Sequence, residues 1–188
     1  FLCSESMFLY WVDINHKKIF KKALSKFASP IEEIRIKSNP SAIISVKKNK
    51  IIYLNNYGIN ELDFNSGNSY KVSHNPDLVR NSNKRSNDGV MLKDSRIIYG
   101  IMDFTPEDLS GSIYLYHNNC HHFIDHIGIP NLFIEHENRI LISDSFNKII
   151  YAYEINNFNN KEVWLDLSSQ SFTPDGGCIG PDGNIYIA

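Results

Sequence analysis

The chain has 188 residues, 42% of them hydrophobic and 12% aromatic, which is enough apolar material for a folded core. Nineteen basic and 21 acidic residues give a net charge of -2, which excludes the strongly basic surface that nucleic acid or an anionic membrane attracts. No apolar run approaches the roughly 20 residues of a membrane helix. The three cysteines are odd in number and widely scattered, so we expect no disulfide framework and a cytoplasmic location.

Short runs rich in β-branched and aromatic residues recur along the chain, each bounded by turn residues. They cover residues 9–12, 51–54, 97–100, 140–143 and 185–188. Their first residues are 42, 46, 43 and 45 positions apart. A period of about 40–50 residues that holds about four strands is typical of the blades of a β-propeller. A β-sandwich with regularly spaced turns is the alternative, but regular phasing over five units favours the propeller.

Two of these units share a longer pattern, Asp-x-x-x-Lys-x-Ile-aromatic, at residues 13–20 and 144–151. It predicts a strand, a tight turn that carries Asn and Lys, and a second antiparallel strand. Residues 111–116 predict a similar strand in the third unit. Helical patterns are nearly absent, and the best candidate, residues 31–36, is short and lies between two prolines. The predicted fold class is therefore all-β.

The blade period and the chain length together predict an incomplete ring. A closed ring of six such blades needs about 260 residues, whereas 188 residues hold about four to five blades. We expect residues 1–188 to form a single partial six-bladed β-propeller domain, with N- and C-terminal parts missing.

Oxygen-bearing side chains recur nine or ten residues before three of the marker strands. They are Asn87, Asn131 and Asp175. Equivalent positions of successive blades are related by rotation, so these side chains are expected to point at one spot near the central channel. Such oxygens suit Ca²⁺ or Mg²⁺, and Zn²⁺ or Mn²⁺ where coordination positions stay open. The alternative is that Asn-Asp-Gly and Pro-Asp-Gly are only good turn sequences.

Several segments match the motifs of one enzyme family in the same order and spacing. They are Leu9-Tyr10-Trp11-Val12-Asp13-Ile14, Arg85-Ser86-Asn87-Asp88-Gly89, Pro130-Asn131-Leu132, Ser143-Asp144-Ser145, Pro174-Asp175-Gly176 and Asp182-Gly183-Asn184-Ile185-Tyr186-Ile187-Ala188. With these segments the chain resembles the senescence marker protein / gluconolactonase / regucalcin family of six-bladed sugar lactonases. The resemblance covers essentially the whole chain.

The resemblance implies a divalent metal held by Asn131, by Asp175 and by a Glu that would lie just before Phe1. Ca²⁺ or Zn²⁺ is the expected ion, with Mg²⁺, Mn²⁺ and Fe²⁺ as alternatives. Arg85 and Asn87 would contact the sugar lactone. One departure from the family pattern is Leu132, which replaces the usual Gly after the metal-binding Asn and is expected to alter the local backbone.

The implied activity is metal-dependent hydrolysis of a sugar lactone, with water attacking a metal-polarised carbonyl. Asp175 is the candidate general base, since it is the only carboxylate in the set. Arg85 is suited to stabilise oxyanion or carboxylate charge. We expect Asp88 to brace its loop. The protein is expected to be a monomer, and these 188 residues alone are expected to have weak activity. Two alternatives are a non-catalytic metal- or ligand-binding propeller and an esterase or phosphotriesterase on the same scaffold.

The densest group of soft metal ligands lies elsewhere in the chain. It consists of His117, Cys120, His121, His122 and His126. A zinc site is conceivable from these residue types, but they follow the strand predicted at 111–116 and belong on an outer hairpin. We expect no functional metal there.

Overall fold

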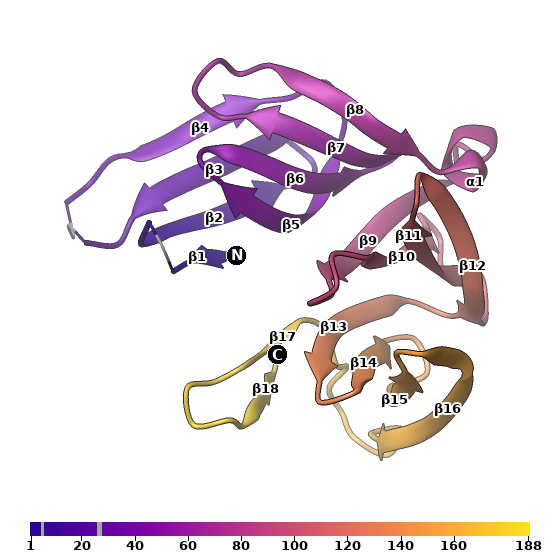
Figure 1. Ribbon diagram of the computed structural model, residues 1–188. Coiled ribbons are helices and arrows are strands. Elements are labelled where there is room, and N and C mark those ends of the chain that lie inside the picture. Colours follow the sequence, from indigo (N-terminus) through magenta and orange to yellow (C-terminus); the bar gives the residue numbers. More distant parts are fainter. Residues whose placement is uncertain (5, 26–27) are drawn as a thin grey trace. The chain divides into compact units, whose positions relative to one another are not determined.

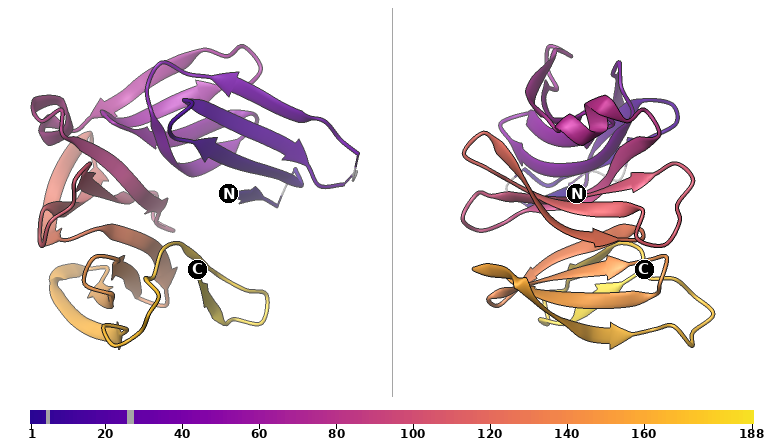
Figure 2. Two further views of the ribbon diagram at one scale, coloured as in Figure 1. Left: turned by 180° about the vertical axis from the view of Figure 1, so that it is seen from behind. Right: turned by 90° about the vertical axis from the view of Figure 1, so that its right-hand side faces the viewer.

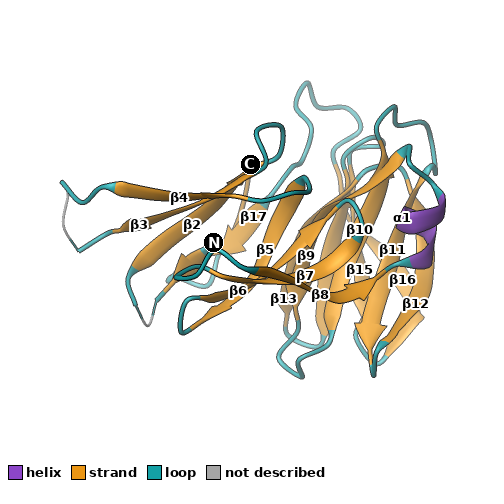
Figure 3. Cartoon of the chain, turned by 90° about the horizontal axis from the view of Figure 1, so that it is seen from above, coloured by secondary structure: helices purple, strands orange, loops and turns teal. Residues whose placement is uncertain are grey.

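The computed structural model describes residues 1–4, 6–25 and 28–188, and strands dominate it (Figures 1 and 3). The chain divides into two compact units, Phe1–Ser82 and Asn83–Ala188. Each unit is built from four-stranded antiparallel sheets whose strands follow one another in chain order. Each strand of a sheet thus pairs with its neighbour in the chain, which is the arrangement expected of propeller blades.

The first unit contains two such sheets. Their strands are β1 (Leu2–Cys3), β2 (Phe8–Asp13), β3 (Lys18–Ala23), β4 (Ile31–Arg35), and then β5 (Pro40–Lys47), β6 (Lys50–Asn55), β7 (Gly58–Asp63) and β8 (Ser69–His74). Alternate residues of the middle strands are buried between the sheets, including Tyr10 and Ile19 from one and Ile51 and Leu62 from the other. Period-2 alternation thus packs the two sheets of this unit face to face.

The second unit contains two further four-stranded sheets and a hairpin, drawn from magenta to yellow in Figure 2. Their strands are β9 (Lys84–Met91), β10 (Ile97–Asp103), β11 (Gly111–His117), β12 (Cys120–Ile127), then β13 (Pro130–His136), β14 (Arg139–Asp144), β15 (Ile149–Glu154), β16 (Asn157–Asp166), and β17 (Gly177–Ile179) with β18 (Ile185–Ile187). The unit therefore holds two full blades and two strands of another.

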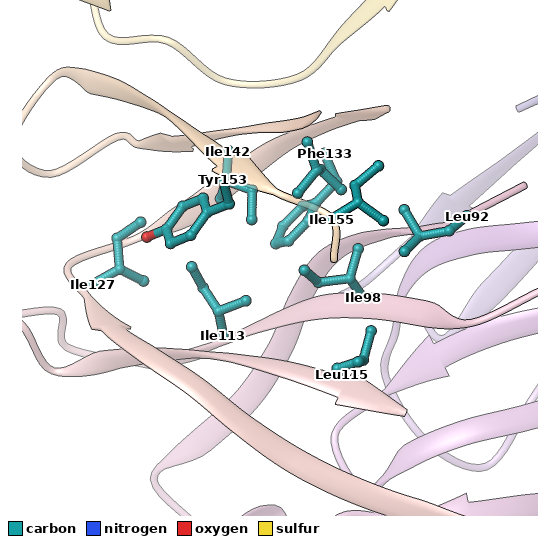
Figure 4. Packing of buried hydrophobic residues seen from close by; sticks show 10 residues of the cluster. Leu92, Ile98, Ile113, Leu115, Ile127, Phe133, Ile142, Tyr153 and Ile155 are labelled. Carbon is teal, nitrogen blue, oxygen red and sulfur yellow. The ribbon is translucent and has the colours of Figure 1, made fainter. Parts of the chain in front are cut away.

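A continuous apolar core joins the two full blades of this unit (Figure 4). Ile98 of β10 and Ile113 of β11 pack with Ile142 of β14 and Tyr153 of β15, and all four are fully buried. Burial of each such side chain contributes about 1.5–3 kcal/mol. This core fixes the position of β9 relative to β13, the two strands that carry most of the candidate site.

The five marker runs of the sequence are confirmed as equivalent strands. Each is the second strand of its sheet, namely β2, β6, β10, β14 and β18. The strand–turn–strand pattern is also confirmed, because Asp13 ends β2 and Asp144 ends β14. Asp13 Oδ1 accepts a hydrogen bond from the backbone N–H of His16, and Asp144 Oδ1 accepts from that of Asn147. The recurring Asp therefore closes the turn.

The weak helical signal at residues 31–36 does not correspond to a helix. Ile31–Arg35 forms strand β4, which pairs with β3, and Lys18 Nζ lies 2.7 Å from Glu33 Oε1 across the two strands. The short helix α1 (Pro76–Arg80) was missed, although Asn75 caps it and proline occupies its first turn. Within the described residues, no helix is long and apolar enough to cross a membrane.

Candidate metal and substrate site

The sequence-predicted site residues lie at one end of the inner strands of the second unit. Asn87 belongs to β9 and Asn131 to β13, the first strands of successive blades, which Figure 1 labels, and Asp175 lies two residues before the start of β17. The backbone N–H of Asp175 donates to the carbonyl of Ala188 at 2.9 Å, which ties this exposed residue to the β17–β18 hairpin. The common offset of the three residues thus corresponds to a common place in the blade.

A β-bulge interrupts the inner strand of both full blades at this place. In β9, Asn87 and Asp88 together oppose Gly100 of β10. In β13, Leu132 and Phe133 together oppose Ile142 of β14. A bulge of this kind, in which two residues oppose one, increases the local twist of the strand. It also redirects side chains that would point to alternating faces in a regular strand. The bulges therefore allow neighbouring polar side chains to gather at the blade ends.

Asn87 contacts Asn131 directly. Its Nδ2 donates to Asn131 Oδ1 at 2.6 Å and to the Pro130 carbonyl at 3.1 Å. Arg85 Nη1 donates to Asn87 Oδ1 at 2.7 Å and to the carbonyl of Ser86 at 3.1 Å. Burial lowers the pKa of the Arg85 guanidinium, which is still protonated at neutral pH. The structure therefore brings together three of the four predicted residues, with a cation at one end.

Ser145 links this group to the segment that carries Asp175. Asn131 Nδ2 donates to Ser145 Oγ at 2.9 Å, and Ser145 Oγ donates to the carbonyl of Pro174 at 2.5 Å. Within the described residues, no hydrogen bond joins Asn131 to Asp175 directly. Sequence reasoning missed the role of Ser145, because only the folded blades show that its hydroxyl lies between two inner strands.

Leu132 keeps a backbone conformation that usually requires glycine. Its φ is 53°, in the left-handed region, although the side chain is fully buried. A Cβ placed on Gly177 would lie 2.4 Å from Leu132 Cδ1, so the leucine packs closely against the start of β17. The left-handed backbone at Leu132 is strained, and the apolar contact with β17 offsets this strain.

Asp88 braces the neighbouring blade. Its carboxylate accepts from the backbone N–H of Gly89 at 2.8 Å, and the N–H groups of Leu132 and Phe133 also stabilise its charge. Burial nevertheless raises the pKa of Asp88, and the negative charge of Asp175 raises it further. The interpretation of Asp88 as a loop brace agrees with these contacts, and the mutual repulsion indicates that two carboxylates face one region.

The donor chemistry of this region fits a hard divalent cation. Asn131 and Asp175 offer a carboxamide and a carboxylate oxygen, and Asp88 adds negative charge nearby. Ser143, directly opposite Asn131 on β14, has a fully buried Oγ with no hydrogen-bond partner in the described chain. Such a hydroxyl is suited to a bound water or ion. No group of three or more His, Cys, Asp or Glu side chains in the described residues could hold a metal, so the carboxamide is essential to this set.

The His- and Cys-rich segment lies on the outer hairpin β11–β12, where the sequence predicted it. His121 Nδ1 is 2.7 Å from the hydroxyl of the buried Tyr99, and its ring also packs against Tyr116. His121 thus has a structural partner, and the segment forms no metal-binding group among the described residues.

Solved structures with the same fold include a regucalcin, a luciferin-regenerating enzyme and a gluconolactonase. Regucalcin, a calcium-binding protein from Agrobacterium tumefaciens, is 19% identical with a TM-score of 0.87 over 100% of this chain and 65% of that one. A luciferin-regenerating enzyme is 19% identical with a TM-score of 0.84 over 100% and 66%. A gluconolactonase from Xanthomonas campestris is 13% identical with a TM-score of 0.75 over 98% and 66%.

These likenesses confirm the predicted fold class, an all-β, incomplete β-propeller. The chain spans about two thirds of the length of each of these proteins. No curated protein matches the chain. The family model described as "SMP-30/Gluconolactonase/LRE-like region" matches residues 2–188. Because this match covers almost every residue, the chain belongs to the SMP-30/gluconolactonase/LRE-like family.

Proposed function

We propose that this protein hydrolyses sugar lactones with the help of a divalent cation held by Asn131 and Asp175. The observation that carries the proposal is the hydrogen bond of 2.6 Å between Asn87 and Asn131, continued through Ser145 to the segment before Asp175. It supports the proposal, because Asn87, a proposed substrate contact, then lies beside Asn131, a proposed metal ligand. Ca²⁺ or Zn²⁺ is the proposed ion, and Mg²⁺, Mn²⁺ and Fe²⁺ are alternatives with the same oxygen ligands.

When bound, the cation supplies a Lewis acid for the lactone carbonyl and a lowered pKa for water. Asp175 is exposed at the end of the blade and is the proposed general base that accepts the proton of the attacking water. Asn131 supplies a neutral oxygen, and Ser145 holds its carboxamide by accepting a hydrogen bond from Nδ2. These residues therefore combine proton acceptance with a fixed ligand orientation.

Arg85 and Asn87 are the proposed substrate contacts. The half-buried guanidinium of Arg85 is held by Asn87 Oδ1 and the carbonyl of Ser86, so it presents its remaining donors in a fixed geometry. A planar cation of this kind suits sugar hydroxyls and the charge that develops on the carbonyl oxygen. The proposed partner is a small sugar lactone. We also propose that the protein is a monomer and that residues 1–188 belong to a single domain. The free cysteines Cys3, Cys120 and Cys178 support the cytoplasm as the proposed compartment.

A propeller that binds a cation without hydrolysis is the second candidate. The similar Agrobacterium protein is described as calcium-binding, and the oxygen donors of this chain suit that ion. An esterase or phosphotriesterase activity would use the same residues and differ only in the substrate.

The test is hydrolysis of a panel of aldonolactones by protein expressed from the complete gene. We expect turnover that is lost with a chelator and restored by adding one of the proposed ions. Asp175→Asn should lower kcat/KM by about 10² or more, whereas the exposed Asp166→Asn should leave it unchanged. Turnover that survives metal removal contradicts the mechanism. Cation binding without turnover of lactones, carboxylic esters or phosphotriesters supports the second candidate.

A further inference from the structure

The first unit contains a polar cavity that the proposed hydrolysis does not use. Its volume is about 400 Å³, and all of its lining residues lie between Arg35 and Ser69. Part of the wall is the segment between β4 and β5, and the rest comes from β6, β7 and the β7–β8 turn. Small-molecule sites have volumes of about 300–1,000 Å³, so the cavity has the size of a site for one small ligand.

Polar side chains inside the cavity are buried and held in place. Tyr53 and Asn55 are 1% and 2% exposed. The Tyr53 hydroxyl is 2.7 Å from Ser69 Oγ, and Asn55 Nδ2 donates to Ser38 Oγ at 2.6 Å. A further hydrogen bond between Tyr53 and Ser38 connects the two pairs. Each hydroxyl in this chain can both donate and accept, so the row can match ligand hydroxyls in either direction.

Asn60 adds a carboxamide to the same wall. The residue is 6% exposed, and its Nδ2 donates to the carbonyl of Gly58 at 3.3 Å. This contact leaves the carboxamide Oδ1 to the cavity that the residue lines. A carboxamide oxygen is a hydrogen-bond acceptor, and a hydroxyl of a bound molecule can donate to it.

Two cations stand at the edge of the cavity. Arg35 and Lys37 line it and are exposed to solvent, and no carboxylate in the described chain lines it. Neither cation forms an ion pair within the described residues. The planar guanidinium of Arg35 suits a carboxylate or a phosphate, and Lys37 adds a second positive charge.

We propose that this cavity binds a small polyhydroxylated anion, a sugar acid or a sugar phosphate. The hydroxyls of Ser38, Tyr53 and Ser69 and the carboxamide of Asn60 recognise the ligand hydroxyls, and Arg35 with Lys37 binds the anionic group. The ring of Tyr57, also in the lining, offers an apolar face to the carbon skeleton. The site is separate in the sequence from Asn131 and Asp175, so its test does not depend on lactone hydrolysis.

Titration calorimetry of the full 188-residue chain tests the proposal, with gluconate and glucose 6-phosphate as probes. We expect saturable binding of at least one of them, with glucose and inorganic phosphate each bound at least about tenfold more weakly, because each lacks one of the two recognised features. The tighter of the two probes identifies the anionic group. Absence of saturable binding for both probes overturns the proposal, as does binding of inorganic phosphate or glucose as tight as that of the probes.

Two variants locate the binding. The double variant Arg35→Gln/Lys37→Gln should weaken binding by at least about tenfold, and Tyr53→Phe, which keeps the ring, should weaken it by about three- to tenfold. Lys47→Gln/Lys48→Gln is the matched control, because it changes the net charge equally at two exposed residues of the same unit that do not line the cavity. Thermal melting confirms that each variant is folded. Unchanged affinity in both cavity variants, or an equal loss in the control, contradicts this location.

Discussion

Asn87 Nδ2 donates a hydrogen bond of 2.6 Å to Asn131 Oδ1, and the two residues lie 44 positions apart on the inner strands of successive blades. The orientation of one candidate metal ligand is thus set by the blade that precedes it. Ser145 holds the other end of the same carboxamide. Both contacts make the geometry of Asn131 sensitive to changes that leave its own side chain intact.

Removal of the Ser145 hydroxyl should weaken cation binding without removing a ligand. Ser145→Ala abolishes the hydrogen bonds to Asn131 and to the Pro174 carbonyl, and loss of such supporting contacts typically costs about 10- to 100-fold in metal affinity. Titration calorimetry with Ca²⁺ and Zn²⁺ measures the change. The exposed Ser169→Ala should bind as the unchanged protein does. An unaltered affinity in Ser145→Ala would show that the hydroxyl does not position Asn131.

The variant Leu132→Gly should be more stable to unfolding than the variant Leu132→Ala. Leu132→Ala keeps the left-handed φ of 53° and loses the buried side chain, a change that costs about 2–5 kcal/mol. Leu132→Gly loses the same contacts but relieves about 1 kcal/mol of backbone strain. Urea unfolding of both variants gives the difference.

The matched control is Ile134, which is buried in the same cluster and has no positive φ. At this position alanine should be favoured over glycine, as in an ordinary strand, so Ile134→Gly should be less stable than Ile134→Ala by about 0.5–1 kcal/mol. The same order of stability at both positions would contradict strain at Leu132.

The stability contribution of Asp88 should fall as pH rises. Burial raises its pKa above the ordinary 3.8. A carboxyl with a raised folded-state pKa stabilises the fold fully below the unfolded pKa, and the contribution is lost as pH rises through the folded value. The free energy of unfolding of the unchanged protein minus that of Asp88→Asn should therefore decrease from about pH 4 upward. Urea unfolding at a series of pH values, in the presence of chelator, measures it.

Asp166 provides a control of opposite sign. Hydrogen bonds from Ser168 hold the pKa of this exposed carboxyl below its ordinary value, so its small contribution is present at higher pH and is lost as pH falls. The free energy of unfolding of the unchanged protein minus that of Asp166→Asn should therefore increase with pH. Parallel trends in the two variants would mean that burial does not govern the titration of Asp88.

A methyl group at Gly100 should separate two blades. A Cβ at this position would lie 2.3 Å from Pro130 Cγ on the next inner strand, and such overpacking costs about 1–3 kcal/mol. Gly100→Ala should lower the urea midpoint, and cation affinity should fall because Pro130 precedes Asn131. Gly176→Ala, with nothing within 4 Å of the added atom, should leave the midpoint unchanged. Equal stability of the two variants would contradict close packing at this seam.

Local patterns predicted the strands well, because alternation and turn residues act over a few positions. The Asp that ends β2 and β14 closes its own turn with nearby backbone N–H groups. Residues 31–36, where charged residues stand between two prolines, gave only a weak helical signal, and local reasoning did not predict their strand. Pairing with β3 decided that segment, because the contact of Lys18 with Glu33 exists only in the sheet.

By itself the sequence determined the blade period, the all-β class and three oxygen-bearing side chains at one offset, since these repeat with the chain. The tertiary structure alone decided that Ser145 joins Asn131 to Pro174, that Leu132 adopts a left-handed backbone, and that Tyr53 and Asn60 line a cavity. Each of these features depends on contacts between separate strands or blades. No periodicity encodes them, because packing sets the bulges, the rotamers and the burial that produce them.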